Sequence, residues 1–170
     1  MSKIIVFTEE GFEGRNAEFK NDVHNLEEKG FGNVISSIKV IGSAWVAYYD
    51  KNFAGEQCIL EEGEYPKLGH KFSSLKMVTE DLDNPKIELF EHVNYAGRRV
   101  TIRKETNLHD IDFSYIASSH KVKGGVWVLY ECPNRQGRQV ISFPGDEVPS
   151  YLPIDFNDKA SYVRPLIPRP

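Results

Sequence analysis

Four copies of one short pattern divide this chain of 170 residues into quarters. Each copy has an aromatic residue, four other residues, a second aromatic residue, one more residue and then glycine. The copies span Phe7–Gly14, Tyr48–Gly55, Phe90–Gly97 and Tyr130–Gly137, with Arg135 replacing the second aromatic residue in the last copy. Their first aromatic residues are separated by 41, 42 and 40 residues. This spacing indicates a repeated supersecondary unit, which constrains the fold more than any other feature of the chain.

A serine-bearing segment follows each copy and strengthens the repeat. The four segments are Val34–Val40, Lys71–Met77, Ile116–Val122 and Lys159–Arg164. The first serine of each segment lies 29, 25, 28 and 31 residues after the first aromatic residue of its copy. Two linked patterns that recur four times at nearly the same spacing indicate a fourfold internal repeat.

The residues around the repeats have the composition of strands. Val40–Tyr49 and Val122–Tyr130 are rich in β-branched and aromatic residues around Gly-Ser and Gly-Gly pairs, which predicts strand, tight turn and strand. Sustained helical periodicity is lacking, and single helical turns are expected only at Asn25–Glu28 and Asn107–Asp110. The chain is therefore predicted to be all-β, a sandwich of Greek keys. The paired aromatic residues and glycines are expected to close folded hairpins rather than to bind a ligand.

Charge separates the chain into two halves. Residues 1–84 carry 9 basic and 15 acidic residues, and residues 85–170 carry 12 basic and 10 acidic residues, so the net charges are −6 and +2. The step lies at Asp83–Lys86 and predicts two units with different surfaces. The total net charge of −4 argues against a nucleic-acid partner.

The sequence shows no targeting or membrane segment. It has no run of 18 apolar residues, and the N-terminus turns acidic at Glu9-Glu10 without an apolar stretch of signal-peptide type. We therefore expect a cytoplasmic protein, with non-classical secretion as the alternative. Cys58 and Cys132 are too few for a disulfide scaffold and are expected to be reduced thiols, one bridge or an intermolecular link being the alternative.

The repeated residues resemble those of the βγ-crystallin superfamily. Its Greek-key motif carries the same aromatic and glycine pattern followed by a serine-bearing loop, and two motifs make one domain. The resemblance covers the whole chain and implies a domain over 1–83, with motifs 1–42 and 43–83. It implies a second domain over 84–170, with motifs 86–124 and 125–166 and a proline-rich tail at 165–170. Arg135 in the fourth corner and Tyr162 in place of the second serine depart from the pattern.

Within that superfamily the chain most resembles the epidermis-differentiation-specific proteins. The segments that carry this likeness are Met77–Ile87 and Glu91–Gly97. In such proteins an aerolysin-like pore-forming region commonly follows the paired domains, and no such region is present in these 170 residues. The chain is thus either a fragment or a naturally short member. The likeness suggests a recognition or regulatory module of a pore-forming, membrane-active assembly as one alternative function.

The resemblance also implies calcium sites. The family pattern is Asn/Asp, Asn/Asp, any, any, Ser/Thr, Ser, in which the third residue supplies a carbonyl and the fifth a hydroxyl. The second residue reaches the ion of the partner motif, and a further carbonyl follows the first corner aromatic residue of the partner motif. Asn157–Tyr162 is the best match, and its Asp158 is the only anionic ligand.

Four ligand sets follow from that pattern. The complete set with a carboxylate uses the carbonyls of Glu131 and Ile116, the Ser118 hydroxyl and Asp158. Its twin uses the carbonyls of Glu91 and Lys159 and the Ser161 hydroxyl, but Tyr115 supplies no oxygen. The first domain has a complete neutral set, the carbonyls of Thr8 and Lys71 with Ser73 and Asn33, and a poor set at Tyr49, Val34 and Ser36 that meets His70.

Few carboxylates predict weak calcium binding, with a dissociation constant on the order of 10⁻⁴ M or higher at most sites. The alternative is that these serines only hydrogen-bond the folded hairpins. The five histidines show no zinc-ligand spacing, and neither cysteine has a catalytic signature, so no enzyme is expected. The predicted function is a non-enzymatic calcium-binding module with a binding or structural role. A calcium-independent structural crystallin is a further alternative.

Partners other than calcium are less constrained. A homodimer through domain pairing or another protein partner remains open. The second half is locally basic at Arg98-Arg99, Arg103-Lys104 and Arg135 with Arg138. This basic stretch is either a solvated sheet face or a docking patch for an acidic partner, a membrane headgroup or an anionic glycan.

Overall fold

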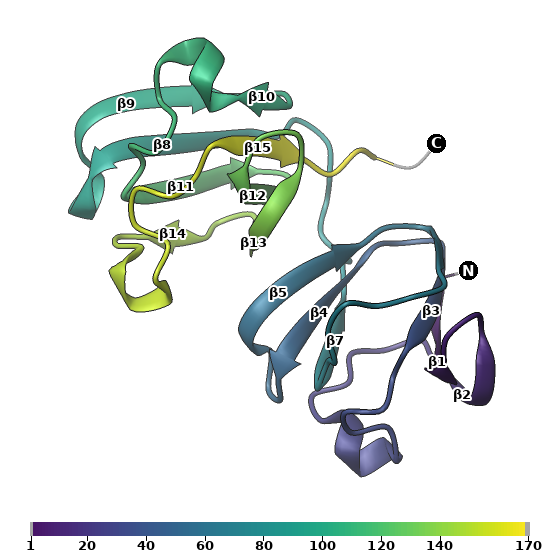
Figure 1. Cartoon of the computed structure of the whole chain (residues 1–170). Coiled ribbons are helices and arrows are strands. Elements are labelled where there is room, and N and C mark those ends of the chain that lie inside the picture. Colours follow the sequence, from purple (N-terminus) through teal and green to yellow (C-terminus); the bar gives the residue numbers. More distant parts are fainter. Residues whose placement is uncertain (1, 169–170) are drawn as a thin grey trace. The chain divides into compact units, whose positions relative to one another are not determined.

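The computed structural model describes residues 2–168, which form strands and short 3-10 turns (Figure 1). The all-β prediction is confirmed. The chain divides into two compact units, Met1–Thr79 and Glu80–Pro170, whereas the charge step placed the boundary at residues 83 and 84. Each unit contains two of the four sequence repeats and is described by itself.

The first unit has seven strands and one 3-10 turn. They are β1 (Lys3–Glu9), β2 (Glu13–Phe19), η1 (Leu26–Lys29), β3 (Ser37–Ile41), β4 (Trp45–Asp50), β5 (Ala54–Leu60), β6 (Gly63–Tyr65) and β7 (Ser74–Met77). β1 pairs antiparallel with β2 and β3, and β4 pairs antiparallel with β5 and β7. β6 comes from the second repeat but pairs with β3 of the first, so the two repeats exchange a strand.

The second unit repeats this arrangement with eight strands and three 3-10 turns. They are β8 (Lys86–His92), η2 (Val93–Tyr95), β9 (Ala96–Ile102), β10 (Thr106–Asn107), η3 (Leu108–Ile111), β11 (Ser119–Gly124), β12 (Trp127–Cys132), β13 (Gln136–Ser142), β14 (Glu147–Val148), η4 (Leu152–Ile154) and β15 (Tyr162–Pro165). β8 pairs with β9 and β11, and β12 pairs with β13 and β15. β10 pairs with β15 and β14 with β11, so both repeats lend a strand to the other, which is the Greek-key exchange.

Each repeat begins with a folded hairpin, and the β8–β9 hairpin illustrates its construction. Its tip places Asn94 and Tyr95 at positive φ, 57° and 60°, which is costly for an aromatic residue. The Ser119 hydroxyl accepts the Tyr95 N–H at 3.1 Å and donates to the His92 carbonyl at 2.7 Å. The ring of Tyr95 packs edge-on against Phe90 with 5.5 Å between centroids. These contacts hold the strained tip in place, which explains the aromatic residues and the second serine of the pattern.

The fourth hairpin replaces those contacts with an ion pair. Arg135 donates two hydrogen bonds to the Glu105 carboxylate, at 2.9 and 2.7 Å, and the Tyr162 hydroxyl donates a third at 2.6 Å. The hydrogen bond from Arg135 is the main reason that the pKa of Glu105 falls to about 2. The two departures from the family pattern, Arg135 and Tyr162, therefore share one partner.

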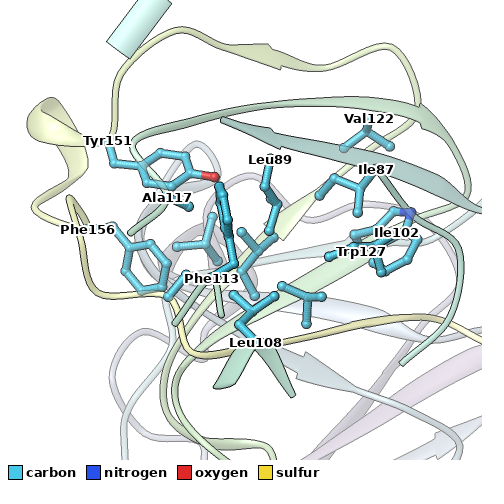
Figure 2. Packing of buried hydrophobic residues seen from close by; sticks show 14 residues of the cluster. Ile87, Leu89, Ile102, Leu108, Phe113, Ala117, Val122, Trp127, Tyr151 and Phe156 are labelled. Carbon is cyan, nitrogen blue, oxygen red and sulfur yellow. The ribbon is translucent and has the colours of Figure 1, made fainter. Parts of the chain in front are cut away.

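Each unit encloses its own apolar core between its paired strands. Trp45 is fully buried in the first core and Trp127 in the second. Figure 2 shows the second core, where Tyr151 and Phe156 from the loop before β15 lie beside Phe113. Because these aromatic residues anchor the loops that precede β11 and β15, the core of the second unit also positions the polar groups on those loops.

Candidate metal centre

Three loops of the second unit converge on one open pocket of about 470 Å³. They are the tip of the β8–β9 hairpin, the loop before β11 and the loop before β15. Backbone hydrogen bonds join them, including Asp158 N–H to the Ala117 carbonyl at 3.2 Å and Tyr151 N–H to the Ser118 carbonyl at 3.1 Å. The pocket is lined by Glu91, His92, Val93, Tyr115, Ile116, Ser118, Leu152, Asn157 and Asp158. We refer to it as the Asp158 pocket.

The Asp158 pocket gathers oxygen atoms from three of the predicted ligands. The Ser118 hydroxyl donates to Asp158 Oδ1 at 3.2 Å, and its oxygen lies 3.5 Å from the Ile116 carbonyl oxygen. Asp158 has a φ of 56°, a left-handed conformation that aspartate and asparagine tolerate better than most residues. The backbone thus directs a carboxylate from the fourth repeat toward a serine of the third.

Asn157 and Glu91 add two further oxygen donors. Asn157 Oδ1 is buried and has no hydrogen-bond partner among residues 2–168, although the side chain lines the pocket. Glu91 is also among the lining residues, and its Oε1 accepts the Arg98 N–H at 3.0 Å. A buried amide oxygen without a hydrogen-bond partner, on a residue that lines the same pocket as a carboxylate and a hydroxyl, belongs to an oxygen ligand set suited to a hard cation such as Ca²⁺. The sequence noted Asn157 as the first residue of the pattern but gave it no ligand role.

The structure exchanges Glu91 and Glu131 between the two predicted sets: Glu131 lies with Ser161 and Glu91 with Ser118. The Ser161 hydroxyl donates to the Glu131 carbonyl at 2.9 Å, whereas Glu91 lies with Ser118 and Asp158. The reason is strand pairing. The strand that follows each serine pairs with the first strand of the same repeat, and the Ser118 N–H accordingly donates to the Phe90 carbonyl at 2.9 Å. The carbonyl after a corner aromatic residue therefore lies beside the serine of the same repeat, not of the partner repeat.

The set around Ser161 offers less to a cation. Its hydroxyl is engaged with Glu131, and the Lys159 ammonium lies 3.4 Å from the Asp155 carboxylate. Tyr115, which stands at the position that Asp158 occupies in the other repeat, is exposed and carries no carboxylate. The Asp155 carboxylate of this loop is paired with the Lys159 ammonium and does not replace the ligand that Tyr115 fails to supply.

The first unit has a pocket at the corresponding place beside Ser73. It is lined by Asn25, Glu27, Gly32, Asn33, Asp50, Lys51 and Ser73, and we refer to it as the Ser73 pocket. Ser73 and Asn33 lie together as predicted, but Thr8 belongs to the other hairpin, where its hydroxyl accepts the Arg15 N–H at 2.9 Å. Glu27 and Asp50 make the pocket acidic, which the sequence pattern missed. Neither residue occupies a position that the calcium pattern specifies, so the pattern carried no signal for them.

Lys71 was predicted to contribute a backbone carbonyl, but its side chain also acts on the neighbouring site. Lys71 Nζ donates to the Ser36 hydroxyl at 2.7 Å and lies 3.4 Å from the Ile35 carbonyl. An ammonium group at the Ser36 loop repels a divalent ion there. His70, the remaining member of that set, instead lies against the Tyr49 ring with 4.8 Å between centroids.

Comparison with models of protein families gives a match to both halves of the chain. The family model described as Beta/Gamma crystallin matches residues 3–78 and 86–165. This chain belongs to the β/γ-crystallin family. The two matched segments correspond to the two units and together cover most of the chain.

Among the crystallin's relatives, the Epidermal differentiation-specific protein of Cynops pyrrhogaster is 40% identical over 168 residues, covering 98% of this chain and 50% of that protein. Human Beta-crystallin B1 is 37% identical over 154 residues, covering 85% of this chain and 61% of that protein. The chain thus spans about half to three fifths of these relatives. A solved β/γ-crystallin from Ciona intestinalis is 33% identical, covers 45% of this chain and 99% of its own, and has a TM-score of 0.43.

Two arginines of the second unit, Arg98 and Arg138, have partners within the unit. Arg98 stacks on the Phe113 ring at 4.8 Å and donates to the Asp112 carbonyl. Arg138 donates to the Asp155 carbonyl at 2.7 Å. Both carbonyls belong to the left-handed residues that end 3-10 turns, at φ values of 55° and 53°. These arginines therefore stabilise the loops that carry the Asp158 pocket.

The remaining chemistry-bearing residues of the crystallin are dispersed. Within residues 2–168, no three His, Cys, Asp or Glu side chains form a metal cluster, so a cation would depend on mixed carboxylate, hydroxyl, amide and carbonyl oxygens. Cys58 and Cys132 are free thiols, and burial raises the pKa of Cys58 to about 11. No helix in the described part of the chain is long and apolar enough to cross a membrane.

Proposed function

We propose that this protein is a non-enzymatic calcium-binding β/γ-crystallin module whose principal ion site is the Asp158 pocket. The observation that carries the proposal is the buried Asn157 Oδ1 without a hydrogen-bond partner, on a residue that lines the same pocket as Asp158, Ser118 and Ile116. These groups would hold the ion, and the ion would tie the loops before β11 and β15 together. The role is binding and structural.

The composition of the pocket favours Ca²⁺ over Mg²⁺ and predicts weak binding. Calcium accepts six to eight oxygens in irregular geometry, whereas Mg²⁺ demands a regular octahedron. Glu91 and Asp158 are carboxylates, but Glu91 already accepts a backbone hydrogen bond. With water completing the coordination, we expect a dissociation constant on the order of 10⁻⁴ M.

We propose a second, weaker ion at the Ser73 pocket. Asp50 and Glu27 supply negative charge there, and Asn33 takes the position that Asp158 occupies in the second unit. Lys51 lines the same pocket and offsets part of that charge. The Ser36 and Ser161 loops are expected to bind no ion, because Lys71 contacts the Ser36 hydroxyl and Tyr115 supplies no carboxylate to the Ser161 set.

Calcium titration by calorimetry tests the proposal with a matched pair of variants. Asp158→Gly removes the carboxylate and Asp155→Gly is the control, because both residues have positive φ, 56° and 53°, which glycine adopts without strain. The intact chain should bind two ions, Asp158→Gly should lose the tighter one, and Asp155→Gly should keep both. Absence of binding heat in the intact chain would refute the proposal and favour the calcium-independent structural role.

A second candidate is a recognition module within a membrane-active, pore-forming assembly. It is supported by the 40% identity to the Cynops pyrrhogaster protein, half of which lies outside the region matched by this chain. Leakage of a trapped dye from lipid vesicles tests it. Leakage caused by the complete native protein, and none by this chain alone, would support the module role. No leakage by either would refute it.

A further inference from the structure

The rims of the two pockets differ in polarity. Three apolar side chains surround the Asp158 pocket: Leu152 is 65% exposed, Tyr115 is 53% exposed and Val93 is 37% exposed. In the repeat register, the corresponding residues of the first unit are Glu27, His70 and Lys51. Both pockets therefore contain polar lining residues, but among the described residues the exposed apolar side chains surround the Asp158 pocket and not the Ser73 pocket. We refer to Leu152, Tyr115 and Val93 as the apolar rim.

The apolar rim is held in this exposed position by the local backbone. Leu152 begins η4, which is followed directly by Pro153, and the N–H of Tyr151 is bonded to the loop before β11. Tyr115 is kept at a φ of 59°, a conformation that is costly for a bulky residue, and its ring projects outward rather than into the core. Val93 lies at the tip of the β8–β9 hairpin. Three separate loops thus present one apolar side chain each around the same oxygens.

We propose that the Asp158 pocket docks on an anionic phospholipid bilayer through its bound calcium ion, with Leu152, Tyr115 and Val93 entering the headgroup layer. The inference rests on the proposed calcium function. The groups named above supply fewer oxygens than the six to eight that calcium accepts, so coordination positions stay open for lipid phosphate or carboxylate oxygens. Without the ion, Asp158 and Glu91 repel an anionic surface, which makes the docking calcium-dependent.

Size favours a bilayer over a protein partner. The apolar rim consists of three exposed side chains, a small patch beside the roughly 800 Å² a side that a stable protein interface buries. Membrane surfaces, by contrast, are bound by a few apolar side chains acting together with electrostatic attraction. The second unit, Glu80–Pro170, carries 12 basic and 13 acidic residues, so the electrostatic attraction to an anionic surface comes from the bound ion.

Cosedimentation with vesicles tests the proposal on the full chain. The vesicles contain equal parts of phosphatidylserine and phosphatidylcholine, and parallel samples contain phosphatidylcholine alone. The intact chain should sediment with the anionic vesicles in millimolar calcium, and should stay in solution with a chelator or with neutral vesicles. Asp158→Gly should lose both calcium binding and sedimentation.

The rim is tested by replacing its apolar side chains with small uncharged ones, which leave the charge of the pocket as it is. Leu152→Ser and Val93→Ser should each weaken vesicle binding roughly tenfold while calcium binding by calorimetry stays unchanged. Ile167→Ser is the matched control, since Ile167 is 71% exposed and lies outside the pocket lining. This variant should sediment as the intact chain does. Thermal melting verifies that all three variants are folded.

The outcomes separate this inference from the proposed function. If calorimetry of the intact chain shows no heat of calcium binding, both the proposed calcium function and the membrane docking are refuted. Calcium binding without sedimentation would remove only the docking, and calcium-dependent self-association in that case would assign the rim to a second copy of the chain. Sedimentation in chelator, or equal sedimentation of Leu152→Ser and the intact chain, would also overturn it.

Discussion

Protonation of His120 should destabilise the second unit as the pH falls below 6.5. His120 is fully buried in β11, where Nδ1 lies 2.5 Å from the Tyr151 hydroxyl and Nε2 lies 2.8 Å from the Ser142 hydroxyl. Ser142 donates to the Asp146 carboxylate at 3.2 Å, so Nε2 must be the donor and Nδ1 the acceptor for Tyr151. A second proton on the ring would displace the hydrogen bond from Tyr151.

The size of the effect follows from the pKa of His120. Burial lowers this pKa from 6.5 to about 3, so the native state stays neutral where the unfolded chain binds a proton. The contribution to stability is complete above the unfolded value and is lost as the pH falls toward the folded value. Each pH unit costs up to about 1.4 kcal/mol, and the free energy of unfolding should fall by about 2 kcal/mol between pH 7 and 5.

Denaturant unfolding followed by tryptophan fluorescence measures this difference. The chain has two tryptophans, one in each core, so a Trp45→Phe background leaves Trp127 as the reporter of the second unit. His120→Gln in that background should show little change between pH 7 and 5. The control His109→Gln, at an exposed position of the same unit, should keep the full pH dependence. A chelator removes any calcium contribution.

Two results would refute the reasoning. One is a free energy of unfolding that does not change between pH 7 and 5 in the background protein. The other is an equal fall in His120→Gln, because the titrating group would then lie elsewhere. Measurements stop at pH 5 so that protonation of ordinary carboxylates makes little contribution.

Two further predictions concern packing. Gly97→Ala should destabilise the second unit by about 1–3 kcal/mol, because φ is +79° and an added Cβ would lie 2.5 Å from His92 Cδ2. Gly145→Ala, with a similar φ but open space around the added Cβ, should cost less. Equal losses of the two variants in denaturant unfolding would contradict this prediction. Trp45→Phe should lower the free energy of unfolding by about 1 kcal/mol less than Trp127→Phe does. Trp45 Nε1 is buried with no hydrogen-bond partner within residues 2–168, whereas Trp127 Nε1 donates to the Gly124 carbonyl at 3.0 Å. Thermal unfolding of the two variants compares them, and the reverse order would show that ring packing outweighs the hydrogen bond.

The repeat predicted the fold because it encodes local conformation. Glycine at positive φ, the aromatic pair and the second serine act together to fold a hairpin over, as the contacts of Tyr95 and Ser119 show, and only the fourth hairpin folds with other contacts. Four such hairpins, with strand-like residues between them, left little alternative to an all-β arrangement. The departures Arg135 and Tyr162 were visible in the sequence, but their shared partner Glu105 was not, since it comes from a distant loop.

The sequence by itself therefore determined the folded hairpins, the all-β class and Asp158 as the strongest ligand candidate. Only the tertiary structure decided which oxygens share a pocket: it placed Glu91 with Ser118, left Asn157 Oδ1 without a donor and brought Lys71 Nζ to the Ser36 loop. The physical reason is that a hairpin is stabilised by residues close in sequence, whereas a cation site is assembled from loops that meet only after the strands have paired.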